Sequence, residues 1–212
     1  MTNAILTSGI AFSACSYHCR RIMSRDALRV VFLALWVTLL GSCQDARAEE
    51  IPILPGAASE RSIKAAFVYK FLTYVDWPPT AFAQGDSPIV IGVIGAEDIA
   101  AELLQVIGNR TVNNRPVVVR RLREGDSLIG VHVLFIGRGE GPRIGAIARA
   151  AQQRAILTVA EAPGAIEQGA MINFVLVEGR VRFDIALDTA DRSGLRLSSR
   201  LLAVAREVRT GS

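Results

Sequence analysis

Apolar residues follow two spacings along this chain, and each spacing predicts its own kind of element. Continuous runs rich in Val, Ile and Phe are typical of buried parallel strands, whereas stripes that repeat every three or four residues are typical of amphipathic helices. The runs predict strands over residues 88–94, 116–122, 131–136 and 155–159. The stripes predict helices over residues 59–74, 97–107 and 143–154. Strands and helices thus alternate through the middle of the chain.

The last third of the chain has a different pattern. Residues 171–177 and 181–185 are two β-rich runs joined by a glycine-containing turn, which predicts an antiparallel hairpin. Leucine and valine then recur at helical spacing over residues 195–208, which predicts an amphipathic helix in a region opened by Thr189 or Asp191. The predicted fold is α/β: a three-layer sandwich with a mainly parallel sheet flanked by helices, plus an antiparallel hairpin near the C-terminus.

The first 48 residues have the pattern of an export signal. Residues 30–40 form an 11-residue apolar run, which is too short to span a bilayer but has the length found in signal peptides. Ala46-Arg47-Ala48 follows and fits the small-x-small rule for signal cleavage. We therefore expect an exported, periplasmic chain that begins at Glu49 and forms a single domain over residues 49–212.

The leader also holds every cysteine of the chain, at positions 15, 19 and 43. The segment from Leu40 to Cys43 resembles a lipobox, which leaves lipidation of Cys43 as an alternative to cleavage after Ala48. Met23 has the features of a natural start, with an over-long leader before it. A chain that begins at Glu49 has no cysteine, so its stability depends on its core rather than on disulfides.

The distribution of charge argues against nucleic-acid binding. The leader carries five arginines against two aspartates, whereas the remaining chain has 19 basic and 18 acidic side chains. The only basic cluster after the leader is Arg120, Arg121 and Arg123, and Glu124 and Asp126 dilute it. A nucleic-acid-binding domain needs a basic face on its folded part, so we expect no nucleic-acid partner.

The chain after the leader offers few groups for catalysis. His132 is its only histidine and lies within a predicted buried strand, where a hydrogen-bonded core residue is the expected role. Without a cysteine or a second histidine, neither a Cys–His pair nor a zinc site of His or Cys type can form. Ser198-Ser199 lacks the setting of a nucleophile elbow, and Asp184 and Asp188 alone do not make a glycosidase. We predict no enzymatic activity and no catalytic, cofactor-binding or metal-binding residues.

Two glycine-rich turns leave an alternative open. Gly92-Val93-Ile94-Gly95 ends a predicted strand, but Glu97 and Asp98 place negative charge where a dinucleotide phosphate would bind. The turn over residues 137–142 lacks the Lys-Ser/Thr ending of a phosphate loop. Because α/β sheets bind ligands at the carboxyl ends of their strands, loops 95–98 and 137–141 remain candidates for binding a small molecule.

Several segments, taken together and in order, resemble the YfiR-like family of periplasmic regulators. IKAAFVYKF at residues 63–71 and VDWP at 75–78 are similar to the opening of that family, and HVLFI at 132–136 to its central strand. The closing motifs VRFDI, SGL and LSSRLL match best, and the resemblance spans about residues 60–209. The family-motif positions are Trp77, Pro78, His132, Arg182, Asp184, Gly194, Ser198, Ser199 and Arg200.

The resemblance implies a small exported α/β protein without enzymatic activity or cofactor. It implies that the protein binds an inner-membrane diguanylate cyclase from the periplasmic side and holds it inactive, and that an outer-membrane lipoprotein relieves this repression. Cyclic-di-GMP signalling, and with it biofilm formation and motility, would depend on the balance between repression and its relief. Self-association as a homodimer is a further expectation. Many members carry a cysteine before the central strand where this chain has Val131, so redox control is not expected.

Three side chains are candidates for contacting such a partner. Trp77 lies beside the break that ends the first predicted helix, and Arg196 and Arg200 lie on the polar side of the predicted C-terminal helix. Charge on a helix face usually serves solvation, which is the alternative for both arginines.

Overall fold

The computed structural model describes residues 55–211. The leader, the expected cleavage site between Ala48 and Glu49, the alternative lipidation site Cys43 and the expected start at Met23 lie outside the described residues. These expectations therefore stay predictions.

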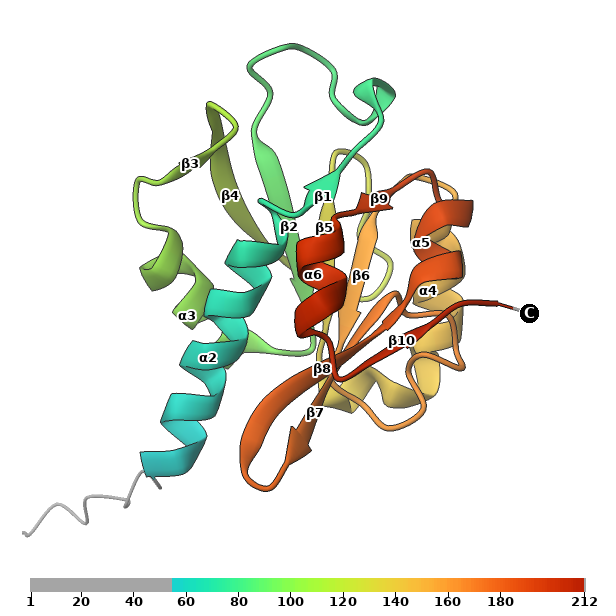
Figure 1. Ribbon diagram of the computed structural model, residues 1–212. Coiled ribbons are helices and arrows are strands. Elements are labelled where there is room, and N and C mark those ends of the chain that lie inside the picture. Colours follow the sequence, from blue (N-terminus) through green and yellow to red (C-terminus); the bar gives the residue numbers. More distant parts are fainter. Residues whose placement is uncertain (1–54, 212) are drawn as a thin grey trace, which may run out of the picture. The chain divides into compact units, whose positions relative to one another are not determined.

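A sheet of eight strands forms the centre of the described chain, in the order β10-β8-β7-β6-β5-β2-β4-β3 (Figure 1). Strands β4, β2, β5, β6 and β7 are parallel neighbours, and β7 and β8 form the predicted antiparallel hairpin. The mainly parallel sheet is thus confirmed. The strands are β2 (Ile89–Ile94), β3 (Thr111–Val112), β4 (Arg115–Leu122), β5 (Val133–Ile136), β6 (Leu157–Ala160), β7 (Ile172–Val177), β8 (Arg180–Ala186) and β10 (Glu207–Arg209).

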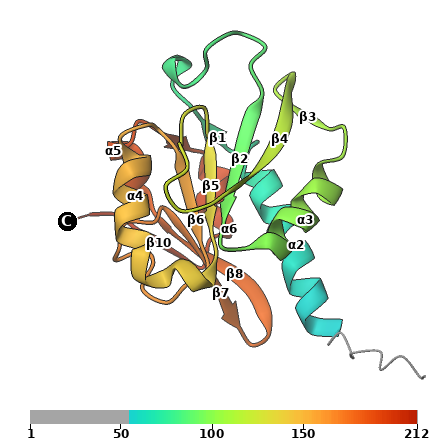
Figure 2. The ribbon, with the colours of Figure 1, turned by 180° about the vertical axis from the view of Figure 1, so that it is seen from behind.

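Helices cover both faces of this sheet, which confirms the predicted three-layer sandwich. The helices α2 (Pro55–Phe71), α3 (Glu97–Ile107) and α6 (Ser199–Val204) lie on one face, and α4 (Ile144–Gln152) lies on the other (Figures 1 and 2). Two clusters of buried apolar residues correspond to these faces, because successive strand residues point to opposite sides. The cluster beneath α2 is the larger and contains Phe71, Phe135 and Phe183.

The prediction of an amphipathic helix over residues 195–208 is wrong. The segment divides into β9 (Arg196–Leu197), α6 and β10, and the helix α5 (Leu187–Arg192) that precedes it begins before Thr189 and Asp191. Gly194, with φ of 74°, turns the chain after α5. Backbone pairing explains the two strands: β9 pairs with β1 (Val75–Asp76), and β10 adds to β8 at the edge of the sheet. Of the leucines with helical spacing, Leu195 precedes β9, Leu197 lies in β9, and Leu201 and Leu202 lie in α6.

Two short antiparallel pairs were not predicted. One joins β1 to β9 across the sequence, and the other joins β3 to β4 through Asn113-Asn114. Both asparagines have positive φ, 52° and 63°, as expected of a tight hairpin turn. The pair β1–β9 fastens the end of α2 to the chain that enters α6.

Candidate functional site

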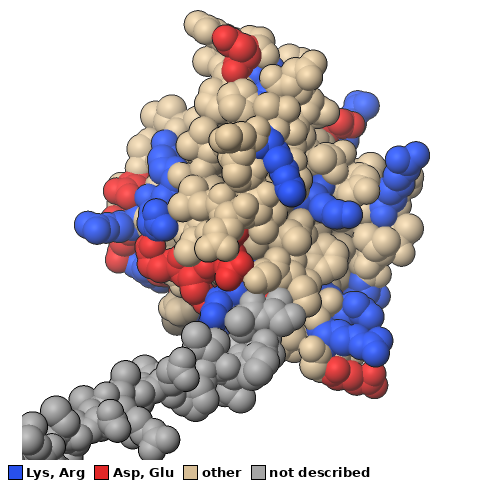
Figure 3. All heavy atoms as spheres, turned by 90° about the vertical axis from the view of Figure 1, so that its left-hand side faces the viewer, with Lys and Arg blue, Asp and Glu red and all other residues tan. Residues whose placement is uncertain are grey.

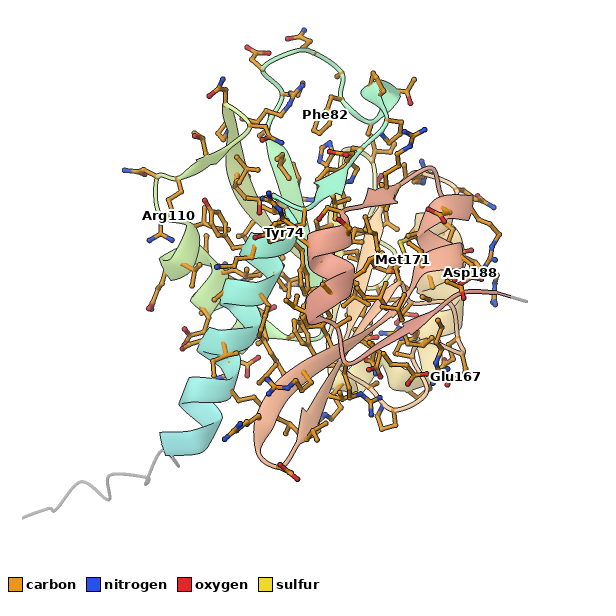
Figure 4. All side chains as sticks on the ribbon, in the orientation of Figure 1. Tyr74, Phe82, Arg110, Glu167, Met171 and Asp188 are labelled. Atoms are coloured by element: carbon orange, nitrogen blue, oxygen red, sulfur yellow. The ribbon has the colours of Figure 1, made fainter. Side chains whose placement is uncertain are left out.

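The chain between α2 and β2 folds back over His132. Trp77 Nε1 donates a hydrogen bond to the carbonyl oxygen of His132 at 3.3 Å, and the two rings meet edge to face at 6.4 Å. Phe82 stacks on the imidazole at 4.5 Å, and the guanidinium of Arg115 lies 4.0 Å from the centre of the Phe82 ring. We call Trp77, Phe82, Arg115 and His132 the His132 stack; Phe82 is labelled in Figure 4.

Hydrogen bonds fix the protonation state of His132, which is only 4% exposed. Its Nδ1 accepts the N–H of Val90 at 3.1 Å, so the proton is on Nε2, which donates to the carbonyl oxygen of Ala81 at 3.1 Å. Burial lowers the pKa of His132; the bond to Ala81 opposes this shift, and the positive charge of Arg115 adds to it. The imidazole is therefore a neutral, hydrogen-bonded part of the core.

A groove of about 340 Å³ opens between α2, β8 and α6. Its floor is aromatic, because Phe67 and Phe71 of α2 contact Phe183 of β8 with ring centres 5.4 and 5.1 Å apart. Tyr74, labelled in Figure 4, lies where the chain leaves α2 and approaches α6, and Val204 forms part of the α6 wall. We call this feature the α2–α6 groove.

Three cations surround the α2–α6 groove. Lys70, Arg182 and Arg200 all line it and are exposed. None of them forms an ion pair with a carboxylate among residues 55–211, and the only side-chain bond of Arg182 goes to a backbone carbonyl at 3.4 Å. The groove therefore combines an apolar floor with a positive rim.

Other family-motif positions have roles inside the fold. Asp184 is buried and binds Arg206 through two hydrogen bonds, one of 2.7 Å, which fastens the segment before β10 to β8. Ser198 accepts the N–H of Leu201 and caps α6, whose first residue is the exposed Ser199. Pro78 precedes the short helix η1 (Pro79–Ala81).

The structure separates the three residues predicted to contact a partner. Trp77 is half-buried in the His132 stack, whereas Arg200 lines the α2–α6 groove together with Arg182. Arg196 is exposed on β9, where its backbone pairs with that of Asp76. Only Arg200 thus lies in a recess suited to binding.

The two loops predicted as an alternative ligand site close against each other. A Cβ atom on Gly137 would lie 2.0 Å from the carbonyl oxygen of Gly95, and one on Gly95 would lie 2.6 Å from Cγ of Glu140. Glu97 and Asp98 pair with Arg121 and Arg61, and Figure 3 shows acidic and basic patches side by side on the α3 side. A separate apolar pocket of about 420 Å³ lies between α4 and the loop at 123–128.

Residues 55–211 also lack a metal-binding cluster and a membrane-spanning helix. In this part of the chain no group of three or more His, Cys, Asp or Glu side chains is arranged to hold a metal ion. Likewise, none of its helices combines the length and the apolar character needed to cross a membrane.

Several residues that organise these features were not predicted from the sequence. Lys64 is buried, and its ammonium binds Glu161 at 2.6 Å and also Glu60, which ties α2 to the end of β6. Lys70 lines the groove but was not predicted as a contact residue. Its position three residues after Phe67 places both side chains on one helix face. The roles of Phe82 and Arg115 had no local signal, because they depend on a loop that folds back over the sheet.

One family model matches the chain. It describes a YfiR/HmsC-like family and covers residues 61–206, from α2 to the residue before β10. The matched range contains both the His132 stack and the α2–α6 groove. No curated protein matches the sequence.

Proposed function

Because the chain belongs to the YfiR/HmsC-like family, we propose that it is a periplasmic regulator that binds an inner-membrane diguanylate cyclase and represses it. The observation that carries this proposal is the family match, which extends over nearly all of the described domain. In this proposal the regulator is not an enzyme, and its effect on cyclic-di-GMP, biofilm formation and motility passes through the cyclase.

Repression by binding requires that the regulator distinguishes two states of its partner. A protein that binds the inactive sensor domain more tightly than the active one shifts the population toward the inactive state. A shift from mostly active to mostly inactive needs several kcal/mol of differential affinity, which a recess with an apolar floor and a charged rim can provide. An outer-membrane lipoprotein that sequesters the regulator would reverse the shift.

The roles found for the polar motif residues support a non-enzymatic function. His132 uses both ring nitrogens in hydrogen bonds to backbone groups, and Asp184 is engaged by Arg206. Ser198 caps a helix. Each of these groups is thus occupied in maintaining the fold.

Export is part of the same proposal. Cleavage between Ala48 and Glu49 would release the domain into the periplasm, and lipidation of Cys43 would instead anchor it to a membrane. The mass of the mature chain distinguishes the two, because lipidation adds acyl chains to an N-terminal Cys43.

Deletion of the gene tests the regulatory function. We expect cellular cyclic-di-GMP to rise in the deletion strain and to return on complementation, and we expect the affinity-tagged protein to purify with a membrane diguanylate cyclase. Unchanged cyclic-di-GMP together with no cyclase in the purified sample would refute the proposal.

The pocket beside α4 supports a second candidate function, the binding of a small apolar molecule. Leu122, Leu134 and Ile147 line this pocket, which has Arg143 and Arg154 at its border. A ligand raises the free energy of unfolding by RT ln(1 + [L]/Kd), so a thermal-shift screen of small periplasmic metabolites should contain compounds that raise the melting temperature. A screen without such a compound would count against this function.

A further inference from the structure

Building on the proposed function, we infer that the α2–α6 groove binds an acidic segment of the cyclase. In this arrangement the segment inserts an apolar side chain between α2 and α6 and directs carboxylates toward Lys70, Arg182 and Arg200.

The floor of the groove supplies the apolar half of this site. Phe67, Phe71 and Phe183 are in mutual ring contact, so the floor is held rigidly by the core rather than by mobile surface side chains. Val204 on the opposite wall is 62% exposed, which leaves apolar surface for an inserted side chain to cover. Apolar anchors in such preformed recesses carry much of the affinity in protein interfaces.

The rim supplies the charged half of the site. Lys70 lies on α2, Arg182 on β8 and Arg200 on α6, so the three cations approach the groove from three different elements. Elsewhere, cations such as Arg61, Arg121 and Arg192 are paired with carboxylates of the domain itself. Unpaired charges around an apolar floor attract a segment of opposite charge and determine its orientation.

The same charges disfavour a second copy of this chain as the occupant. In a two-fold contact the same patch faces itself, so one rim of three cations would lie against a second, equally positive rim. Juxtaposed like charges cost free energy at an interface. An acidic segment of a different protein therefore fits the groove better.

Site-specific cross-linking tests this inference. A photoreactive benzoylphenylalanine replaces Val204 in the groove wall or, as the control, Arg149, an exposed residue of α4 on the other face of the sheet. Illumination of cells that contain the membrane cyclase should link position 204, and not position 149, to the cyclase. Mass spectrometry of the linked peptide should show an apolar residue flanked by Asp or Glu.

Charge reversal tests the rim separately. The triple variant Lys70→Glu, Arg182→Glu, Arg200→Glu should retain roughly tenfold less cyclase in affinity purification. The matched control Arg123→Glu, Arg138→Glu, Arg149→Glu has the same net charge and changes three exposed arginines outside the groove, so its retention should stay within about twofold of the natural chain.

The outcomes separate this inference from the proposed function. If the natural chain purifies with the cyclase but both triple variants retain it equally, the groove inference is wrong and the proposed function stands. Cross-links from position 204 to a second copy of this chain, or to a cyclase segment without carboxylates, would also overturn the inference. If the natural chain captures no cyclase and does not alter cyclic-di-GMP, the proposed function fails as well.

Discussion

The His132 stack and the α2–α6 groove both contain family-motif residues, but their polar groups are in opposite situations. In the stack, both ring nitrogens of His132 and the indole N–H of Trp77 have backbone partners at 3.1 to 3.3 Å. Around the groove, three exposed cations have no carboxylate partner among the described residues. The stack is complete within the domain, and the groove is open to another molecule.

This difference distinguishes two roles that a family-motif residue can have, one in maintaining the fold and one in binding another molecule. A polar residue whose bonds are all made inside the domain contributes to the fold, because loss of one partner leaves a buried group unsatisfied. An exposed charge beside apolar surface contributes little to the fold and is available for recognition. Substitutions in the two regions should therefore differ in their effects on stability and on binding.

The floor of the groove belongs to the core, so its loss should have the largest effect on stability. Phe183 is 2% exposed and contacts Phe67, Phe71 and Phe174. Phe183→Ala should lower the free energy of unfolding by about 3–5 kcal/mol, because it leaves a cavity among these rings. Urea denaturation measures this loss, and Val204→Ala in the exposed wall is the control. Equal losses in the two variants would contradict a preformed floor.

Truncation within the stack should have a smaller effect. Phe82 is half-buried between the imidazole of His132 and the guanidinium of Arg115. Phe82→Ala should lower the free energy of unfolding by about 2 kcal/mol through lost apolar burial and ring stacking. The same variant should leave cyclase retention unchanged at temperatures where it is folded. A loss of retention in the folded variant would place the stack in the interface.

Acid should weaken the stack through His132. Because burial lowers the pKa of His132 below 6.5, the unfolded chain takes up the proton first as the pH falls. The contribution of His132 is therefore fully present above pH 6.5 and decreases as the pH falls below 6.5 toward the folded-state pKa. Urea denaturation between about pH 7.5 and about pH 5.5 should show a steeper decline for the natural chain than for His132→Gln. Equal slopes would show that His132 does not titrate as proposed.

Much of the fold could be predicted because its signals are local. The helix over residues 97–107 has the predicted bounds, and the buried parallel strands follow from continuous apolar runs. The C-terminal segment could not be predicted in this way. Its leucines fit a helical period, but β9 and β10 pair with β1 and β8, which are distant in sequence, and this pairing overrode the local pattern.

The groove could be predicted only in part. Arg200 is predicted as a contact candidate because it lies on the polar side of a predicted helix, whereas no such prediction is made for Lys70. The recess itself depends on the packing of α2 against β8 and α6, which lie more than 100 positions further along the sequence. Hydrophobic periodicity identifies which face of each element is buried, but it does not reveal where three elements leave a gap between them.

The smallest effect on stability is expected at the rim of the groove. Lys70→Gln, Arg182→Gln and Arg200→Gln remove charge from exposed side chains without carboxylate partners, so each should change the free energy of unfolding by less than about 0.5 kcal/mol. Urea denaturation at neutral pH measures this change, with Phe82→Ala as the positive control. A rim substitution that destabilised the domain as much as Phe82→Ala would show that the cations support the fold. A stable domain with weakened cyclase retention would instead show that the same charges act only in recognition.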